Sequence, residues 1–547
     1  MVQNFFKKIP AIVWVILSYT VLAVIFTWPL VRHFNTHLLG APEDNQQFYW
    51  NLWWWQKALA AGQNPFHTTW LFFPYGTSLL LHTISPLNAV LAQFFSLFVN
   101  LVASFNALIF FSLIMSGVGM YYLALDIVKD KRAAWLAGLI FTLAPRHISH
   151  IYHHLNIIGI QFIPLVILCL RRLWQGIKPY YFAVWAAVWL TLTFYTDFYN
   201  ALYIGIWATL FVLWRLVWER VDLKKKILAT LVTVVVTAAV CGPLIYPMVQ
   251  EKNSGGYPEW GWDLYGADLA SFALPPPYHW LVGERVAPWY KRLGTNDWEA
   301  THYIGVTVGL LALYGWWRNR RELNFWLGTG VFFTVLSFGP VLHIWGHAIG
   351  NYWPYYWLVQ KIPIIQMAKT AGRFSIFLML ALAIAAAFGV RELLQRWQWR
   401  WGAHGAILGL LVVVGLIVFE FAPGPAPLTL VSAPALYYEI AKDTDAGAIV
   451  DVPAGGWLAS ERYMLYQTIH GKPITVGAIS RAKFGELNFS EELRYTPEFF
   501  KEHGLKYVAL HKQYMSNKDW LQWQGWLVEK DFELVVNDGR VAIYRAY

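Results

Sequence analysis

Residues 11–33 read AIVWVILSYTVLAVIFTWPLVRH, an apolar run that contains no acidic residue. A helix needs about 17–25 residues of this kind to cross the hydrocarbon core of a bilayer, which is ~30 Å thick. The run follows Lys7 and Lys8, and no small-residue cleavage site comes after it. The stretch therefore predicts a first transmembrane helix rather than a removed signal peptide.

Apolar runs of this type recur along most of the chain. We expect about eleven transmembrane helices, because each run approaches the length that a bilayer requires. They lie at residues 11–33, 104–126, 133–146, 155–171, 179–196, 198–217, 227–248, 301–317, 323–340, 372–390 and 404–422. The composition agrees, since 57% of the residues are hydrophobic and 14% are charged, against about 25% charged in soluble proteins. The sequence predicts a polytopic α-helical protein of the cell (plasma) membrane.

Basic residues gather in alternate linkers between these runs, as expected of short cytoplasmic loops. The clusters lie at residues 7–8, 129–132, 171–178, 215–226, 318–321 and 391–400. Topology thus accounts for the net charge of +10 without a nucleic-acid partner. We expect the N-terminus in the cytoplasm and the large loops 34–103, 249–300 and 341–371 outside. This assignment requires the apolar segment 84–103 to stay outside the bilayer.

The chain changes character after the linker APGPAP at residues 422–427. Strand-like runs at 447–452, 506–510, 532–536 and 541–545 alternate with helix-like runs at 461–469, 497–503 and 517–529. Residues 1–422 are therefore predicted to form the membrane domain, and residues 423–547 a soluble extracytoplasmic α/β domain. In the first large loop, aromatic residues at helical spacing over 48–59 predict an amphipathic helix on the membrane surface.

Glu43 and Asp44 form an acidic turn just beyond the first predicted helix. Adjacent carboxylates at the lip of a membrane cavity can bind a metal ion or take a proton from a hydroxyl group. They also suit the cap of the helix that follows, where Asp is a favoured residue. Spacing alone leaves both interpretations open.

This order of segments resembles the GT-C class of membrane glycosyltransferases. The resemblance is carried by Pro42-Glu43-Asp44 with Tyr49-Trp50, by Glu299 with Tyr303-Ile304-Gly305, by Arg373-Phe374 and by the tail segment 463–473, YMLYQTIHGKP. It implies a polyprenyl-phosphate sugar as donor and a catalytic acid in the first loop, acting as base or metal ligand. By that resemblance Asp44 is the catalytic residue and Glu43 its companion. The chain lacks the WWDYG motif of oligosaccharyltransferases, which argues against transfer of a whole glycan to asparagine.

A basic cluster follows the run 133–146 and contains Arg146, His147, His150, His153 and His154. If the helix continues past Pro145, spacings of three and four place His147, His150 and His154 on one face. Such a face could bind a metal or, with Arg146, a lipid phosphate. Interfacial histidines also serve as simple anchors, but without a nearby carboxylate the phosphate is the better functional interpretation.

Three further charged residues lie at predicted outer helix ends. Asp197, in a very short turn, suits either a functional lip carboxylate or an ordinary helix cap. Glu299 complements the dipole of the helix it precedes, whereas Arg373 opposes the dipole of its own and so calls for a phosphate or carboxylate partner. We assign all three to substrate or phosphate binding. Trp260, Trp262 and Tyr265 could form a sugar-stacking surface.

These features predict an inverting glycosyltransferase that moves a sugar from a polyprenyl-phosphate carrier to an extracytoplasmic hydroxyl of a lipid, glycan or protein. The alternatives are a membrane transporter and a non-catalytic GT-C-like scaffold in cell-envelope glycan assembly. No inverted repeat, typical of transporters, is evident. Sequence identifies neither the acceptor nor a cofactor, and a divalent metal at Asp44 is compatible with the acidic turn.

Overall fold

The computed structural model describes residues 10–255, 265–351, 353–361, 365, 370–444, 447–481 and 493–547. The chain folds into two compact units, each assembled from three separate segments. The first unit comprises Met1–Arg32, Ala107–Gly242 and Trp260–Ala426. The second comprises His33–Asn106, Pro243–Glu259 and Pro427–Tyr547. The first large loop thus belongs to the same unit as the C-terminal segment.

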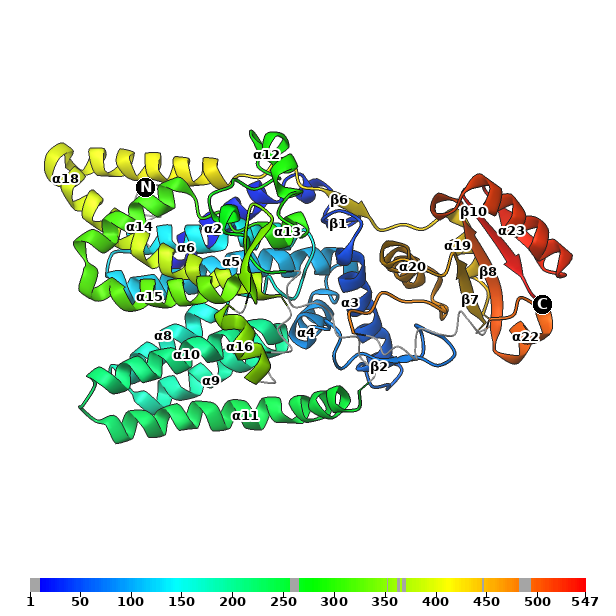
Figure 1. Ribbon diagram of the computed structural model, residues 1–547, viewed down its shortest axis with the longest axis horizontal. Helices are drawn as coiled ribbons and strands as arrows, with labels where there is room; N and C mark the ends of the chain where they lie inside the picture. Colours follow the sequence, from blue (N-terminus) through cyan, green and yellow to red (C-terminus); the bar gives the residue numbers. More distant parts are fainter. Residues whose placement is uncertain are drawn as a thin grey trace. The chain divides into compact units, whose positions relative to one another are not determined.

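The first unit is built almost entirely from helices (Figure 1). They are α2 (Ala11–Phe26), α6 (Lys131–Thr142), α7 (Pro145–Ile151), α8 (Ile163–Trp174), α9 (Pro179–Thr196), α10 (Phe198–Trp218), α12 (Gly283–Tyr290), α13 (Asp297–Ala300), α14 (Val306–Arg318), α15 (Arg320–Ser337), α16 (Pro354–Lys361), the short η3 (Ala371–Ser375) and α18 (Ile376–Phe421). A β-hairpin joins β4 (Val341–Ile344) to β5 (His347–Asn351). Two long helices, α5 (Leu101–Val128) and α11 (Leu223–Asn253), contain residues of both units.

Four helical segments among the described residues are long and apolar enough to cross a membrane: 101–128, 198–218, 223–253 and 371–421. The protein is therefore a helical membrane protein. The other predicted spans largely coincide with shorter helices, so the total of about eleven crossings remains a prediction. One boundary is wrong: the run 155–171 is not helical before α8 begins at Ile163. Pro164 lies in the first turn of α8, a position that tolerates proline where the helix interior does not.

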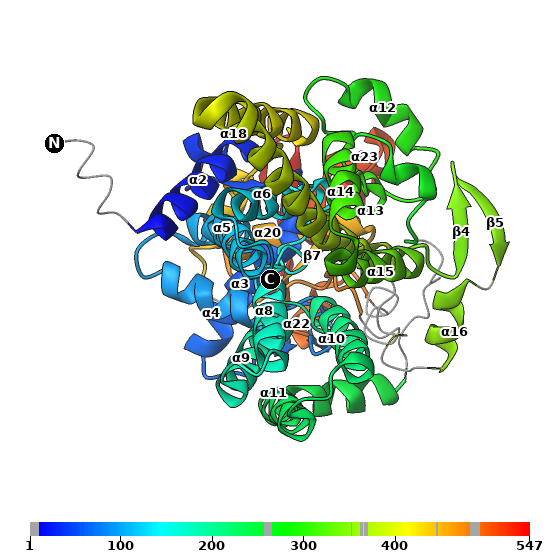
Figure 2. The same ribbon diagram turned by 90° about the vertical axis from the view of Figure 1, so that its left-hand side faces the viewer.

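The predicted spans 372–390 and 404–422 are both contained in α18, which has one non-helical residue, Gly402, at φ 68° and ψ −172°. Figure 1 shows α18 turning back on itself. A Cβ on Gly409 would meet the ring of Trp397, so the two halves of α18 lie against each other. Figure 2 shows α14 beside α18. Gly315 and Gly389 permit this close packing, since a Cβ on either would collide with the backbone of the other helix.

The second unit contains a four-stranded sheet with strand order β7-β8-β10-β9. Strand β7 (Ala448–Val452) runs parallel to β8 (Leu505–His511), while β10 (Val541–Arg545) is antiparallel to both β8 and β9 (Glu533–Asn537). The accompanying helices are α19 (Ala435–Ile440), α20 (Trp457–His470), α22 (Pro497–Glu502) and α23 (Asn517–Glu529). Each predicted strand or helix in this segment lies within four residues of an observed one. A short pair, β1 (His37–Leu39) with β6 (Leu428–Leu430), joins the first loop to this segment.

Helix α3 (Asp44–Ala60) is buried in protein, which differs from the membrane-surface helix expected from its aromatic residues. It packs on α20, and the indole of Trp50 donates a hydrogen bond to Gln467 Oε1 at 2.6 Å. Its large side chains Trp50 and Trp54 are almost fully buried. The aromatic pattern therefore marks a core helix. Helix α4 (Pro86–Phe95) has ten residues and is ~15 Å long, too short to cross a bilayer. The placement of 84–103 outside the membrane stays a prediction.

Candidate functional site

Glu299 occupies the centre of a buried charged cluster in the first unit. It lies on the single-turn helix α13, whose Asn296 side chain accepts a hydrogen bond from the Glu299 backbone N–H at 3.1 Å. Arg146 comes from α7 and Arg373 from η3. The Glu299 side chain is only 3% exposed, so its charge requires partners within the protein.

Two arginines supply those partners. Arg146 donates from Nη2 to Glu299 Oε2 at 2.6 Å and from Nη1 to the Glu299 backbone oxygen at 2.6 Å. Arg373 donates from Nε to Glu299 Oε1 at 3.0 Å, and its Nη2 donates to the same oxygen. The carboxylate is thus shared by two guanidinium groups that lie far from it in the sequence. These three side chains carry one positive charge in excess.

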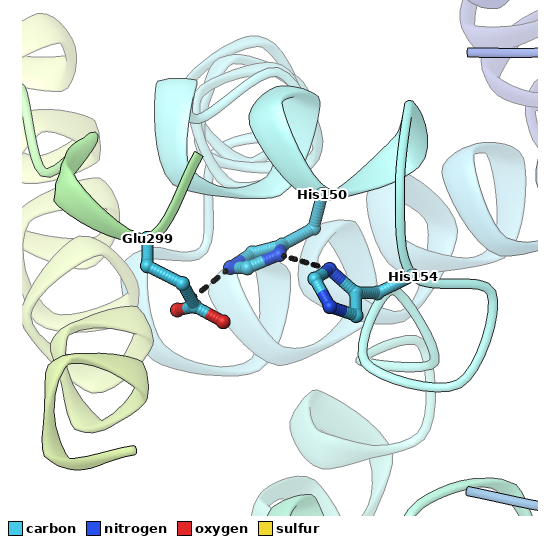
Figure 3. A group of neighbouring side chains, drawn as sticks. All are labelled: His150, His154 and Glu299. Carbon is cyan, nitrogen blue, oxygen red and sulfur yellow. Dashed lines mark hydrogen bonds and ion pairs between the residues drawn. The ribbon is translucent and has the colours of Figure 1, made fainter. Parts of the chain in front are cut away.

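His150 and His154 extend the cluster (Figure 3). His150 Nε2 lies 3.8 Å from Glu299 Oε2, and its Nδ1 lies 3.3 Å from His154 Nδ1. Burial and then Arg146 lower the pKa of His150 well below its usual value, so this imidazole is neutral at pH 7. The pKa of Glu299 is raised by burial, but Arg373 and Arg146 outweigh that effect and hold it well below its usual range.

The spacing of Glu299, His150 and His154 is compatible with a metal ion, because potential ligand atoms lie within 4.8 Å of one another. However, a cation there would adjoin two guanidinium groups that already neutralise Glu299. The excess positive charge suits an anion better.

The His147 ring makes no contact with Glu299 among the interactions described here and is held by the backbone instead: its ring nitrogens lie 2.8 Å and 3.1 Å from the carbonyl oxygens of Thr142 and Ile158. The predicted common helical face is wrong, since α7 ends at Ile151, before His154.

A pocket opens beside this cluster within the first unit. Its empty volume, mouth included, is about 340 Å³, and Arg146, His147, His150, Tyr199, Asn200 and Arg373 are among its lining residues. The Arg373 guanidinium lies 5.2 Å from the centroid of the Tyr199 ring. Arg146, His147, His150 and Arg373 therefore lie in one region, next to Glu299.

Asp197 caps the helix α10 beside this pocket. It is the N-cap of α10: Oδ1 accepts from the Asn200 backbone N–H at 2.8 Å, and Oδ2 accepts from Asn156 Nδ2 at 2.8 Å. Asn200, which Asp197 caps, itself lines the pocket. Trp260 and Trp262 of the suggested sugar-stacking surface lie outside the described residues.

The acidic turn lies in the second unit. Glu43 occupies the N-cap position of α3 but makes no side-chain capping hydrogen bond. Asp44, in the first turn, is half-buried, and its Oδ1 accepts from the indole of Trp457 at 3.1 Å. The structure adds Glu461 from α20, which is fully buried beside Asp44. Sequence reasoning missed Glu461; the signal available was an acid on a helix face that it shares with Met464 and Leu465.

A family model described as "Domain of unknown function (DUF6311)" matches residues 15–419. The chain belongs to this family. No curated protein matches the sequence.

Two solved structures are similar to this member of the DUF6311 family over almost its whole length. One is the archaeal oligosaccharyltransferase AglB from Archaeoglobus fulgidus, in complex with an inhibitory peptide and a dolichol-phosphate; the TM-score is 0.51 at 11% identity, with 91% of this chain and 69% of that chain covered. The other is ArnT from Cupriavidus metallidurans bound to undecaprenyl phosphate, with a TM-score of 0.50 at 14% identity and coverage of 98% and 99%. At such identities the likeness shows the fold alone. The predicted GT-C resemblance is confirmed.

Proposed function

We propose that this protein transfers a sugar from a polyprenyl-phosphate carrier to a hydroxyl group of an extracytoplasmic acceptor. The pocket lined by Arg146 and Arg373 carries the proposal, because these two guanidinium groups share direct contact with only one carboxylate, that of Glu299, in a protein of GT-C fold. A phosphate group in the pocket would be a further negatively charged partner for both arginines. AglB and ArnT, which share the fold, have structures that contain dolichol-phosphate and undecaprenyl phosphate.

In the reaction we propose, the acceptor oxygen attacks C1 of the sugar and inverts it. The bond between C1 and the phosphate oxygen breaks, and the carrier leaves as polyprenyl phosphate. Negative charge grows on that phosphate as the bond breaks, and Arg146 and Arg373 stabilise it. The hydroxyl proton passes to Asp44, the general base, which Glu43 supports.

The remaining site residues support the phosphate pocket. Glu299 holds both guanidinium groups in place, and Asp197 holds Asn200 by capping α10. His150 and His154 place imidazole nitrogens beside Glu299, whereas His147 lines the pocket while its ring is held by backbone carbonyls. A divalent cation at Asp44 stays a prediction, which addition of Mg²⁺ or EDTA to the transfer assay tests.

Carrier binding is tested on the purified full-length protein with undecaprenyl phosphate, dolichyl phosphate and phosphate-free polyprenol. We expect either phosphate, but not the polyprenol, to raise the unfolding temperature. Arg373→Lys should weaken this effect, because lysine keeps the charge but lacks the planar set of donors with which Arg373 holds Glu299 through Nε and Nη2 and still has Nη1 for a phosphate. Equal stabilisation by polyprenol would contradict a phosphate site.

Catalysis is tested with Asp44→Asn. We expect sugar transfer from a polyprenyl-phosphate sugar to a membrane acceptor extract to fall by at least about 100-fold, the lower range for loss of a general base. The substitution is nearly isosteric, and an amide oxygen can still accept the hydrogen bond that the Trp457 indole donates to Asp44. An unchanged unfolding temperature therefore serves as the folding control. Near-normal transfer would remove Asp44 from the role of base, whereas carrier binding without transfer in the wild type would favour the scaffold interpretation.

A further inference from the structure

Glu461 is a fully buried acid that the proposed reaction does not yet use. It lies on α20 with none of its surface exposed. Asp44, on α3, is within hydrogen-bonding reach of Glu461. Glu43 is also close enough to repel a negative charge on Glu461. The two helices belong to the same unit, so this pairing of carboxyl groups is part of its core.

The α3–α20 contact that creates the pair is held by several hydrogen bonds. Gln467 on α20 accepts from the Trp50 indole at 2.6 Å and donates to the Trp70 backbone oxygen at 2.7 Å. Trp457, one helical turn before Glu461, donates its indole N–H to Asp44 at 3.1 Å. Asp44 and Glu461 are therefore placed together by contacts that do not involve Glu461 itself.

Neither oxygen of Glu461 makes a hydrogen bond of good geometry with another described residue, although the Trp457 indole lies close enough to lower its pKa slightly. The neighbouring indole already donates its N–H to Asp44, and an ionised Asp44 can only accept. The titratable groups on this side are Asp44 in the first turn of α3 and Glu43 at its N-cap. His82, which also interacts with Asp44, is neutral because burial lowers its pKa to about 3. Burial first, and then Asp44, raise the pKa of Glu461 to about 10. A proton on Glu461 removes the buried charge and provides the donor that the pair lacks.

We propose that Glu461 is a positioning residue that stays a neutral carboxylic acid and donates its O–H to Asp44. This inference rests on the proposed function of Asp44 as base. Because Glu461 is protonated, the pair carries a single negative charge, and this charge is on Asp44. Together, Glu461 and Trp457 orient Asp44. During transfer the acceptor proton goes to Asp44, and Glu461 keeps its own proton throughout.

The first test needs no transfer assay. A folded-state pKa above the unfolded value means that the folded protein holds an extra proton, so this group's contribution to stability falls as pH rises between about 4.5 and 10. Glu461→Gln removes this dependence. We expect the unfolding temperature of Glu461→Gln, relative to wild type, to rise by at least about 4 °C between pH 5.5 and 8.5. Glu439→Gln, an exposed acid of the same unit, should show no such trend.

A relative unfolding temperature of Glu461→Gln that does not change with pH would overturn the proposal. So would stabilisation of the wild type, but not of Glu461→Gln, by Mg²⁺ or Mn²⁺, because Glu461 would then be an ionised metal ligand.

The second test is transfer activity. Glutamine can donate N–H to Asp44, so Glu461→Gln should stay within about fivefold of wild type, whereas Glu461→Leu should lose about 10- to 100-fold, as for loss of a hydrogen bond to a charged group. A Glu461→Gln variant as inactive as Asp44→Asn would show that Glu461 must be ionised and would overturn the proposal. If the wild type transfers no sugar, the proposed function fails, and the pH dependence of stability still decides the state of Glu461.

Discussion

At the scale of single residues, Glu299 is the charged group on which most other contacts in its unit's site depend. Its partners Arg146 and Arg373 have side chains only 4% and 12% exposed. We expect Glu299→Gln to reduce the free energy of unfolding by about 3–5 kcal/mol, because it leaves two buried guanidinium groups without a counter-charge. Denaturation of the detergent-purified protein measures this loss.

The matched control is Glu533→Gln, which removes the partner of Arg545 at the surface, where the side chains are 66% and 42% exposed. Water and salt screen such a pair, so the cost should stay below about 1 kcal/mol. Equal effects of the two substitutions would mean that the Glu299 cluster is far more solvated than its burial indicates. An added carrier phosphate should partly restore the stability of Glu299→Gln, since it offers the arginines a new counter-charge.

At the scale of elements, the turn within α18 depends on Gly402. Its φ of 68° and ψ of −172° lie in a region that is essentially restricted to glycine. A Cβ there would meet nothing within 4 Å, so substitution acts through the backbone alone. We expect Gly402→Ala to destabilise the protein by about 1–3 kcal/mol, measured by thermal unfolding.

Gly415→Ala in the same element provides the control. Gly415 is helical, and a Cβ there also meets nothing within 4 Å. Alanine is the better helix former, so this variant should be neutral or more stable by up to about 1 kcal/mol. Destabilisation of both variants to the same degree would argue against a backbone requirement at Gly402.

At the scale of the whole molecule, we expect the N-terminus in the cytoplasm and the C-terminal segment outside. Glu420, near the end of α18, accepts from the backbone N–H of Thr307 at the start of α14, whereas Gly389 packs near its far end. The two halves of α18 thus form a hairpin, which corresponds to two of the predicted crossings, 372–390 and 404–422. A reporter fused after residue 430 should be active if it is of a type that works only outside the cytoplasm, and inactive if it is of a type that works only in the cytoplasm. A cytoplasmic signal would mean that the count of crossings is wrong by one.

Local signals predict elements well in this chain. Helices α9 and α10 begin at the expected residues 179 and 198, because Pro179 and the capping Asp197 act within one turn of helix. Helix α3 was also expected, but not its surroundings. Its tryptophans would suit a membrane surface or a protein core equally, and only the presence of α20 decides between them.

The sequence by itself determined which segments are apolar enough to be helices in a bilayer, where the C-terminal strands lie, and which acids and arginines stand at helix ends. These features depend on residues close together in the chain. Only the tertiary structure decided the partners: Glu299 meets Arg146 across 153 positions and Arg373 across 74, and Asp44 meets Glu461 from another helix. The pattern of a single sequence does not show which remote residues are close in space. A buried charge nevertheless requires a partner, and the packing of the elements determines which residue that is.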